Sequence, residues 1–247
     1  MTNPFSLERK NVLVTGASSG IGRAIAITCG KMGANVYLSG RNKQRLEETL
    51  SQMPLGEHHL IEVDLTDLNA IQSAVEELPV LDGVVHNAGI GHRKVCKQVT
   101  IDDINEVMSS NFNGAVLLQS ALLSKKKIAK SASIVFIASR AANSPSIGNA
   151  IYSASKGAII SYSKCLALEL APRLIRVNCI CPAMVWTDLI LKGGVTKEYL
   201  EETQLAYPLK RFGQPQDVAN LVVFLLSDAS SWMTGSSIDL TGGSVNL

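Results

Sequence analysis

Tyr152 and Lys156 have the residue types and the spacing to do chemistry. They are four positions apart, so on a helix their side chains lie on one face, one turn above the other. An ammonium group beside a phenol favours the phenolate, so the pair predicts a tyrosine pKa below the usual value of about 10. Such a tyrosine can act as a general acid or base near neutral pH. A solvated helix face would show the same spacing, so other residues must decide between the two interpretations.

A glycine-rich segment follows a predicted strand at 11–15 and leads into a predicted helix at 20–32. It has the spacing G-x-x-x-G-x-G and runs Thr15-Gly16-Ala17-Ser18-Ser19-Gly20-Ile21-Gly22. Glycine lets the backbone approach a diphosphate closely, and a helix N-terminus offers free N–H groups and a favourable dipole. A purely structural turn would have the same composition. At this place in the chain the segment predicts nucleotide binding, through Gly16, Ser18, Ser19, Gly20, Ile21 and Gly22.

Short apolar strands alternate with helical patterns along the whole chain. The predicted strands are 11–15, 35–39, 60–63, 83–86, 133–138, 175–180 and 237–240, and the main predicted helices are 20–32, 42–52, 67–78, 101–124, 152–170 and 217–226. This alternation implies parallel pairing with helices on both faces. We therefore predict one α/β domain over 1–247, a doubly wound Rossmann fold with a seven-stranded parallel sheet. Ligands of such a fold bind at the carboxyl ends of the strands.

Composition agrees with such a domain. The chain of 247 residues is 46% hydrophobic and 18% charged, so it can bury a large core. A formal net charge of +2 gives no argument for binding to nucleic acid or to a membrane surface. The start of the chain lacks an apolar signal core, and the five scattered cysteines favour free thiols in a reducing cytosol. We expect a cytoplasmic protein without a metal site.

Three motifs occur in order along the chain: the glycine-rich segment at 15–22, Asn87-Ala88-Gly89 after the fourth predicted strand, and Tyr152-x-x-x-Lys156. Together they resemble the short-chain dehydrogenase/reductase family, and the resemblance extends from Thr15 to Gly243. The run 208–219 and the ending Leu240-Thr241-Gly242-Gly243 look most like bacterial 3-oxoacyl-[acyl-carrier-protein] reductases. In one departure, His86 replaces the first asparagine of the family's common Asn-Asn-Ala-Gly.

The resemblance implies four catalytic residues. Tyr152 would protonate the carbonyl oxygen in reduction, or deprotonate the alcohol in oxidation, and Ser139 would hydrogen-bond that oxygen. Lys156 would lower the tyrosine pKa and hold the nicotinamide ribose. Asn111 would anchor a water in a proton relay that ends at Lys156. On their own, Ser139 and Asn111 would be an ordinary strand-end serine and a capping or buried asparagine.

The preferred cofactor is predicted from the end of the second strand, where NAD-selective sites carry an acidic residue. Here Gly40 stands at that position and Arg41 follows it. A guanidinium can bind a 2′-phosphate bidentately, and no carboxylate repels it. NADP(H) is therefore favoured over NAD(H), although Arg41 could merely cap the next helix and Ser19 is not basic as in many NADP-dependent relatives. By resemblance the cofactor site also takes in Asp64, Leu65, Asn87, Ala88, Gly89, Tyr152, Lys156, Pro182, Val185 and Thr187.

The family also implies a substrate. This substrate is a 3-oxoacyl thioester on acyl carrier protein, which is reduced in fatty acid biosynthesis. The resemblance also implies that residues at about 186–208 form a small lid over the substrate, with a hinge at Gly193-Gly194. Lys130 and Arg173, with 125–127 nearby, would receive the acidic carrier protein at the mouth of the active site, unless they are a solvated basic face.

Several questions stay open at the level of the sequence. His92 and Arg93 could face an anionic substrate, or they are exposed loop residues. The substrate could instead be a sugar, a steroid or another small secondary alcohol. A non-catalytic nucleotide-sensing protein could keep the same fold, but the four catalytic residues argue against it. The family implies a homotetramer built through the two long helices and the C-terminal strand region, with Val245 and Leu247 on a neighbour.

Overall fold

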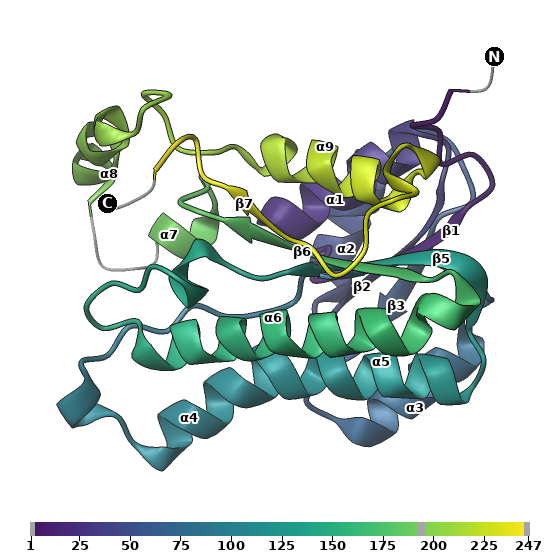
Figure 1. The fold of residues 1–247 in the computed structure, drawn as a ribbon, viewed down its shortest axis with the longest axis horizontal. Coiled ribbons are helices and arrows are strands. Elements are labelled where there is room, and N and C mark those ends of the chain that lie inside the picture. Colours follow the sequence, from purple (N-terminus) through teal and green to yellow (C-terminus); the bar gives the residue numbers. More distant parts are fainter. Residues whose placement is uncertain (1–2, 192–195, 245–247) are drawn as a thin grey trace.

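The computed structural model describes residues 3–191 and 196–244. Seven strands form one parallel sheet in the order β3-β2-β1-β4-β5-β6-β7, which Figure 1 shows between two layers of helices. The strands are β1 (Asn11–Thr15), β2 (Asn35–Gly40), β3 (His59–Glu62), β4 (Leu81–His86), β5 (Ile128–Ile137), β6 (Arg176–Pro182) and β7 (Ser237–Leu240). The predicted doubly wound Rossmann fold with a seven-stranded parallel sheet is confirmed.

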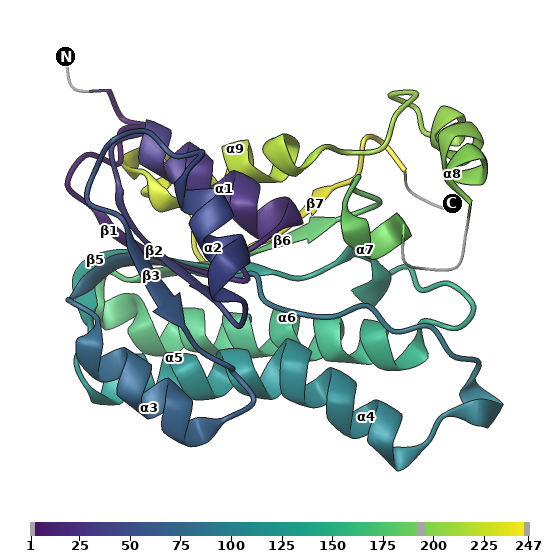
Figure 2. The same ribbon diagram turned by 180° about the vertical axis from the view of Figure 1, so that it is seen from behind.

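Helices cover both faces of this sheet, because the chain crosses over after almost every strand (Figure 2). One face carries α1 (Gly20–Lys31), α2 (Lys43–Leu50) and α9 (Pro215–Leu226). The other carries α3 (Leu68–Glu77), α5 (Gly114–Ser124) and α6 (Ala150–Leu170). Strand residues that alternate in direction therefore reach two different cores.

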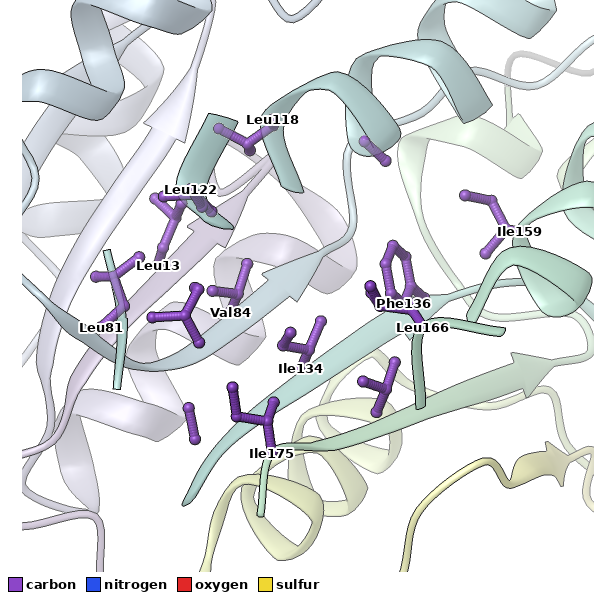
Figure 3. Packing of buried hydrophobic residues seen from close by; sticks show 14 of the residues in the cluster. Leu13, Leu81, Val84, Leu118, Leu122, Ile134, Phe136, Ile159, Leu166 and Ile175 are labelled. Carbon is purple, nitrogen blue, oxygen red and sulfur yellow. The ribbon is translucent and has the colours of Figure 1, made fainter. Parts of the chain in front are cut away.

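The core under α5 and α6 is shown in Figure 3. Its side chains come from the sheet and from both helices, and they include Leu13, Val84, Ile134, Phe136, Leu118, Leu122, Ile159 and Leu166. Each large aliphatic side chain that is buried in this way contributes about 1.5–3 kcal/mol to folding. The core holds α6, and with it Tyr152 and Lys156, against the sheet.

The helix predicted at 101–124 is interrupted. It consists of α4 (Ile101–Met108), a π-helical turn over Ser109–Asn113, and α5. Serine and asparagine compete with the helix for backbone hydrogen bonds, and π-helical turns often mark functional sites. Asn111 is buried within this turn, so the interruption falls on a predicted site residue.

Further differences from the predicted elements are local. β5 begins at Ile128, five residues before the predicted start. The apolar pattern of the strand is interrupted there by polar Lys130 and Ser131, and Ser131 has a φ of 64°, so the sequence does not indicate a strand. Two short helices in the predicted lid, α7 (Asp188–Leu191) and α8 (Lys197–Thr203), are too short to show a periodic pattern. The predicted hinge Gly193-Gly194 and the interface residues Val245 and Leu247 lie outside the described residues.

His86, at the end of β4, belongs to the core under α5. Its Nε2 lies 2.9 Å from Oε1 of Gln119, and its ring stacks on Phe136 at 4.5 Å between centroids. Burial lowers the pKa of His86 from its ordinary 6.5 to about 4, while the hydrogen bond with Gln119 opposes the shift. The histidine is therefore neutral in the folded chain at neutral pH.

We expect the free energy of unfolding to fall by about 3 kcal/mol as the pH drops from about 6.5 to 4. The unfolded chain takes up a proton on His86 near pH 6.5, whereas the folded chain resists protonation until about pH 4. Urea unfolding at pH 7.5 and pH 4.5 measures the difference. His86→Asn cannot titrate but keeps a polar group toward Gln119, so its stability should depend less on pH. Equal pH dependence in both proteins would contradict the prediction.

No helix in the described ranges is long and apolar enough to cross a bilayer. Within the same ranges, no three His, Cys, Asp or Glu side chains gather in a way that could hold a metal ion. The cysteines are free thiols, and three of them are buried: Cys29, Cys179 and Cys181.

Candidate active site

The glycine-rich segment and Asn87 meet at the carboxyl ends of β1 and β4, which are neighbours in the sheet although far apart in sequence. The chain leaves these two strands toward opposite faces, which is where doubly wound folds bind ligands. Thr15 Oγ1 accepts hydrogen bonds from the backbone N–H of Asn87 (3.0 Å) and of Ala88 (3.1 Å). The Asn87 amide donates to Thr15 O at 3.1 Å and to Gly16 O at 3.3 Å. Asn87 therefore fixes the shape of the glycine-rich segment.

The segment has the form of a diphosphate cradle. Gly16 and Gly20 have positive φ angles of 65° and 51°. A Cβ on Gly22 would lie 2.1 Å from the carbonyl oxygen of Gly16, so this crossing requires glycine. α1 begins at Gly20, and Ser19 at its N-cap makes no side-chain capping bond. Free N–H groups and the positive end of the helix dipole thus face the loop, which fits the diphosphate of a dinucleotide.

Tyr152, Lys156 and Ser139 come together at the carboxyl end of β5. Tyr152 lies in the first turn of α6, Lys156 one turn further, and Ser139 follows the strand. The phenol is hydrogen-bonded with the Ser139 hydroxyl. Lys156 Nζ donates to Ile137 O at 2.9 Å and lies 5.9 Å from the centroid of the Tyr152 ring. The predicted catalytic set of tyrosine, serine and lysine is assembled in space.

The prediction that Lys156 lowers the tyrosine pKa is wrong for this chain. Burial raises the pKa of Tyr152, and the hydrogen bond with Ser139 only opposes the rise. The Lys156 ammonium is itself buried, which lowers its pKa to about 8. It points to the strand carbonyl of Ile137 and not to the phenol. Helical spacing correctly placed the two residues together, but it could not show that Lys156 is buried and Tyr152 half-buried.

Asn111 reaches the same site from the π-helical turn. Its Oδ1 accepts from the N–H of Ile90 at 2.7 Å, and its Nδ2 donates to Ile90 O at 3.0 Å and to Ser155 Oγ at 3.1 Å. A Cβ on Gly89 would lie 2.9 Å from Asn111 Oδ1 and 3.6 Å from Lys156 Nζ. Asn111 Oδ1 and Lys156 Nζ therefore both lie close to Gly89.

Arg41 and Asp64, predicted at the adenosine end of the cofactor, follow the neighbouring strands β2 and β3. Arg41 Nη1 lies 3.9 Å from Asp64 Oδ2, and the Arg41 side chain is 66% exposed. Asp64 Oδ1 accepts from the N–H and the hydroxyl of Thr66 at 2.9 and 2.8 Å. The Thr66 backbone N–H is the main cause that lowers the pKa of Asp64. Leu65 is buried beside the pair. The Arg41 side chain is thus exposed, and its ion-pair contact with Asp64 is long.

Two arginines near this site were not among the predicted residues. Arg23 donates to the carbonyl oxygen of Ser18 at 2.8 Å and forms an ion pair with Glu48 of α2 at 3.1 Å. It therefore links the glycine-rich segment to α2. Arg45 pairs with Asp188 at 3.2 Å and joins α2 to α7. Their positions in the sequence could have indicated that they lie near the site. Arg23 directly follows the glycine-rich segment, and Arg45 is four residues after Arg41.

The lid begins beside the glycine-rich segment. Pro182 ends β6, and the methyl group of Thr187 would lie 3.2 Å from a Cβ on Gly20. Val185 is joined to Gly213 by a parallel bridge. The lid has a small core of its own, formed by Leu200, Tyr207 and Phe212 with Ala183, Trp186 and Ile190 packed on it. The predicted cofactor residues Pro182, Val185 and Thr187 therefore follow one another between the end of β6 and α7, with Thr187 beside Gly20.

The basic residues predicted at the mouth of the active site lie elsewhere. Lys130 is near the start of β5, and Arg173 follows the end of α6. Both lie at the amino edge of the sheet, and the length of α6, roughly 30 Å, separates Arg173 from Tyr152. Arg173 donates to Ile128 O, and Lys125 pairs with Glu76 at 3.0 Å. Within one chain they therefore do not flank the active site, and binding of a carrier protein by these residues stays a prediction.

The loop at 91–96 is tied to the start of α4. Lys94 Nζ and His92 Nε2 lie 2.7 and 3.1 Å from the carboxylate of Asp103. The Lys94 hydrogen bond is the main cause that holds the pKa of Asp103 well below its usual range. The His92 side chain is only 12% exposed, whereas Arg93 is exposed. Asp103 thus offsets the positive charge that the sequence placed in this loop.

Comparison with known proteins shows which family the chain belongs to. Residues 16–244 match the family model described as enoyl-(acyl carrier protein) reductase. The 3-oxoacyl-[acyl-carrier-protein] reductase of Aquifex aeolicus is 35% identical, with 97% of this chain and 98% of that protein covered. The L-xylulose reductase of Caenorhabditis elegans is 33% identical, with 98% of each covered.

Solved structures give the same result. A Beutenbergia cavernae protein proposed to be an NAD(P)-dependent gluconate 5-dehydrogenase, solved with NADP at low occupancy, is 33% identical. It superposes with a TM-score of 0.88, and 98% of each chain is covered. The likeness in sequence and in fold extends over nearly the full length of the chain. The chain belongs to the short-chain dehydrogenase/reductase family of oxidoreductases.

Proposed function

We propose that the protein reduces a ketone to a secondary alcohol with NADPH, and that the ketone is a 3-oxoacyl thioester on acyl carrier protein. One observation carries the reaction: half-buried Tyr152, bonded with Ser139 and one turn from Lys156, lies at the same sheet edge as the uncapped start of α1. When bound, the nicotinamide supplies a hydride to the carbonyl carbon. The carbonyl oxygen takes its proton from Tyr152.

The electrostatics of the site suit reduction. Because burial raises the pKa of Tyr152, the phenol keeps its proton at neutral pH and can act as the acid. The Ser139 hydroxyl would hold the substrate oxygen beside the phenol. Lys156, with a pKa of about 8, is mostly protonated at pH 7 and can hold the nicotinamide ribose while it returns a proton to Tyr152.

Asn111 would take part through an oxygen atom. Both hydrogens of its amide are already donated, to Ile90 and to Ser155. A water that Asn111 anchors would therefore have to donate to an Asn111 oxygen. Its place across Gly89 from Lys156 supports a relay from solvent to the lysine.

The substrate is inferred from relatives. The Aquifex aeolicus reductase acts on 3-oxoacyl groups of acyl carrier protein, and its similarity covers almost the entire chain. The Caenorhabditis elegans relative at nearly the same identity is an L-xylulose reductase, so a sugar is the second candidate. Initial rates with NADPH against acetoacetyl thioesters, xylulose and a panel of simple ketones separate the two. Turnover of xylulose with no turnover of acetoacetyl thioesters would overturn the thioester proposal.

We expect a lower Michaelis constant for NADPH than for NADH, and Arg41→Gln should raise the NADPH value about tenfold. A charge-assisted hydrogen bond to the 2′-phosphate is worth roughly 1.5–3 kcal/mol, and partial exposure of Arg41 reduces this. The NADH value should stay the same, since that cofactor lacks the phosphate. Arg9→Gln, an exposed arginine in the N-terminal segment, is the control. Equal or reversed values for the two cofactors in the wild type would refute the preference.

The remaining expectations concern partners and location. Binding of acyl carrier protein by Lys130 and Arg173 has no support within one chain, because both lie at the far edge of the sheet. Assembly as a homotetramer and a cytoplasmic location stay predictions from the family resemblance.

A further inference from the structure

Ser155 lies between Tyr152 and Lys156 on α6, and its side chain is completely buried. Its hydroxyl donates to the carbonyl oxygen of Tyr152 at 2.7 Å. The Ser155 oxygen also accepts a hydrogen bond from Asn111 Nδ2 at 3.1 Å. Ser155 therefore touches two residues of the proposed catalytic set without facing the substrate.

The Asn111 amide is held on two sides. Toward the loop after β4 it pairs with both the N–H and the carbonyl oxygen of Ile90, at 2.7 and 3.0 Å. Toward α6 it has the bond to Ser155. Ile90 follows Gly89, which packs between Asn111 and Lys156. The Ser155 hydroxyl thus joins α6 to the loop that separates the proposed relay residues.

We propose that Ser155 is a positioning residue, which orients the Asn111 amide and through it the loop at Gly89-Ile90. The inference rests on the proposed function, since it assigns Asn111 to the proton relay. Without the Ser155 oxygen, one N–H of Asn111 would be buried without a partner, because Asn111 is only 2% exposed. A buried unpaired donor is costly enough to turn the amide away from its place.

The chain offers a matched control on the same helix. Ser163 is 2% exposed, and its hydroxyl donates to Ile160 O at 2.9 Å, three residues back, as Ser155 does to Tyr152. It also accepts a hydrogen bond, from the Cys179 thiol at 3.0 Å. Ser163→Ala therefore removes the same local bonds from the same helix, two turns away from the site.

Amide hydrogen exchange at Ile90 tests the contact without any enzyme assay, because the Ile90 N–H donates to Asn111. In Ser155→Ala we expect this amide to exchange about five- to tenfold faster, the ratio for loss of one ordinary hydrogen bond. In Ser163→Ala the rate should match the wild type. An unchanged Ile90 rate in Ser155→Ala would overturn the proposal. If Ser155→Ala does not fold, Ser155→Cys fills the space with a weaker acceptor and should show a smaller increase.

Kinetics show whether Ser155 acts through Asn111. Ser155→Ala should lower kcat about tenfold while the dissociation constant of NADPH, followed by fluorescence, changes less than twofold. Added to Asn111→Leu, Ser155→Ala should cause no further loss of kcat. An equal kcat loss in Ser163→Ala, or full additivity with Asn111→Leu, would refute the positioning role. If the wild type reduces no ketone, the proposed function fails while the exchange experiment still decides the role of Ser155.

Discussion

Tyr152→Phe is expected to lower kcat for ketone reduction by about a thousandfold, while NADPH still binds. General acid catalysis contributes roughly 10²- to 10⁴-fold, and the variant removes the acidic proton but keeps the ring that packs at the start of α6. Steady-state rates with the best ketone of the panel give the loss in kcat. Fluorescence titration with NADPH gives the dissociation constant, which should change by less than about threefold.

Tyr162→Phe is the matched control for this prediction. Tyr162 lies on the same helix and contacts Phe112 and Phe136 edge-on, at 6.2 and 5.9 Å between centroids. Burial raises the pKa of its phenol to about 12, so the phenol stays protonated throughout the assay range. Its loss should leave kcat unchanged. If Tyr152→Phe keeps more than a tenth of the wild-type kcat, another group supplies the proton and our assignment is wrong.

Gly22→Ala should abolish NADPH binding and lower the free energy of unfolding by several kcal/mol. The added Cβ would lie 2.1 Å from Gly16 O and 2.5 Å from Asn87 Nδ2, and the first of these is backbone that cannot move aside. The crossing of the glycine-rich segment over α1 would have to open, at a cost at the upper end of the range for single substitutions. Urea unfolding and NADPH titration measure the two effects.

Gly157→Ala is the contrasting substitution. Beyond the backbone of its own helix α6, no described atom lies within 4 Å of a Cβ built on Gly157. Alanine should therefore raise the free energy of unfolding by about 0.5–1 kcal/mol, through its better helix propensity. If Gly22→Ala were no more harmful than Gly157→Ala, the close approach at Gly16 would not be a requirement of the fold.

The sequence predicted the sheet and the site well where the signal was local. Alternating strands and helices indicated the seven strands, and fixed motifs brought Ser139, Tyr152 and Lys156 to one edge. It failed on the tyrosine pKa because a charge pair is visible in spacing, whereas burial is a property of the packed chain. It also missed the π-helical turn at Asn111, since the bond to Ile90 that accompanies it comes from a distant loop.

The basic residues Lys130 and Arg173 show a different kind of limit. Lys130 and Arg173 follow the ends of two helices that run antiparallel to the strands, so both must lie at the amino edge. The predicted order of helices and strands already implies this position, whereas the family resemblance pointed to the opposite edge. Arg45 and Asp188, in contrast, are separated by 143 positions, and no local pattern could have paired them.

At the end of β4, the adjacent residues His86 and Asn87 have different structural roles. His86 points into the core toward Gln119, and Asn87 points the other way and holds the glycine-rich segment. Protonation that displaces the His86 ring from its stack with Phe136 would also displace the adjacent Asn87, which shapes the glycine-rich segment. Acid should therefore weaken cofactor affinity in the same pH window in which it weakens the fold, and bound dinucleotide should in turn protect His86 from protonation.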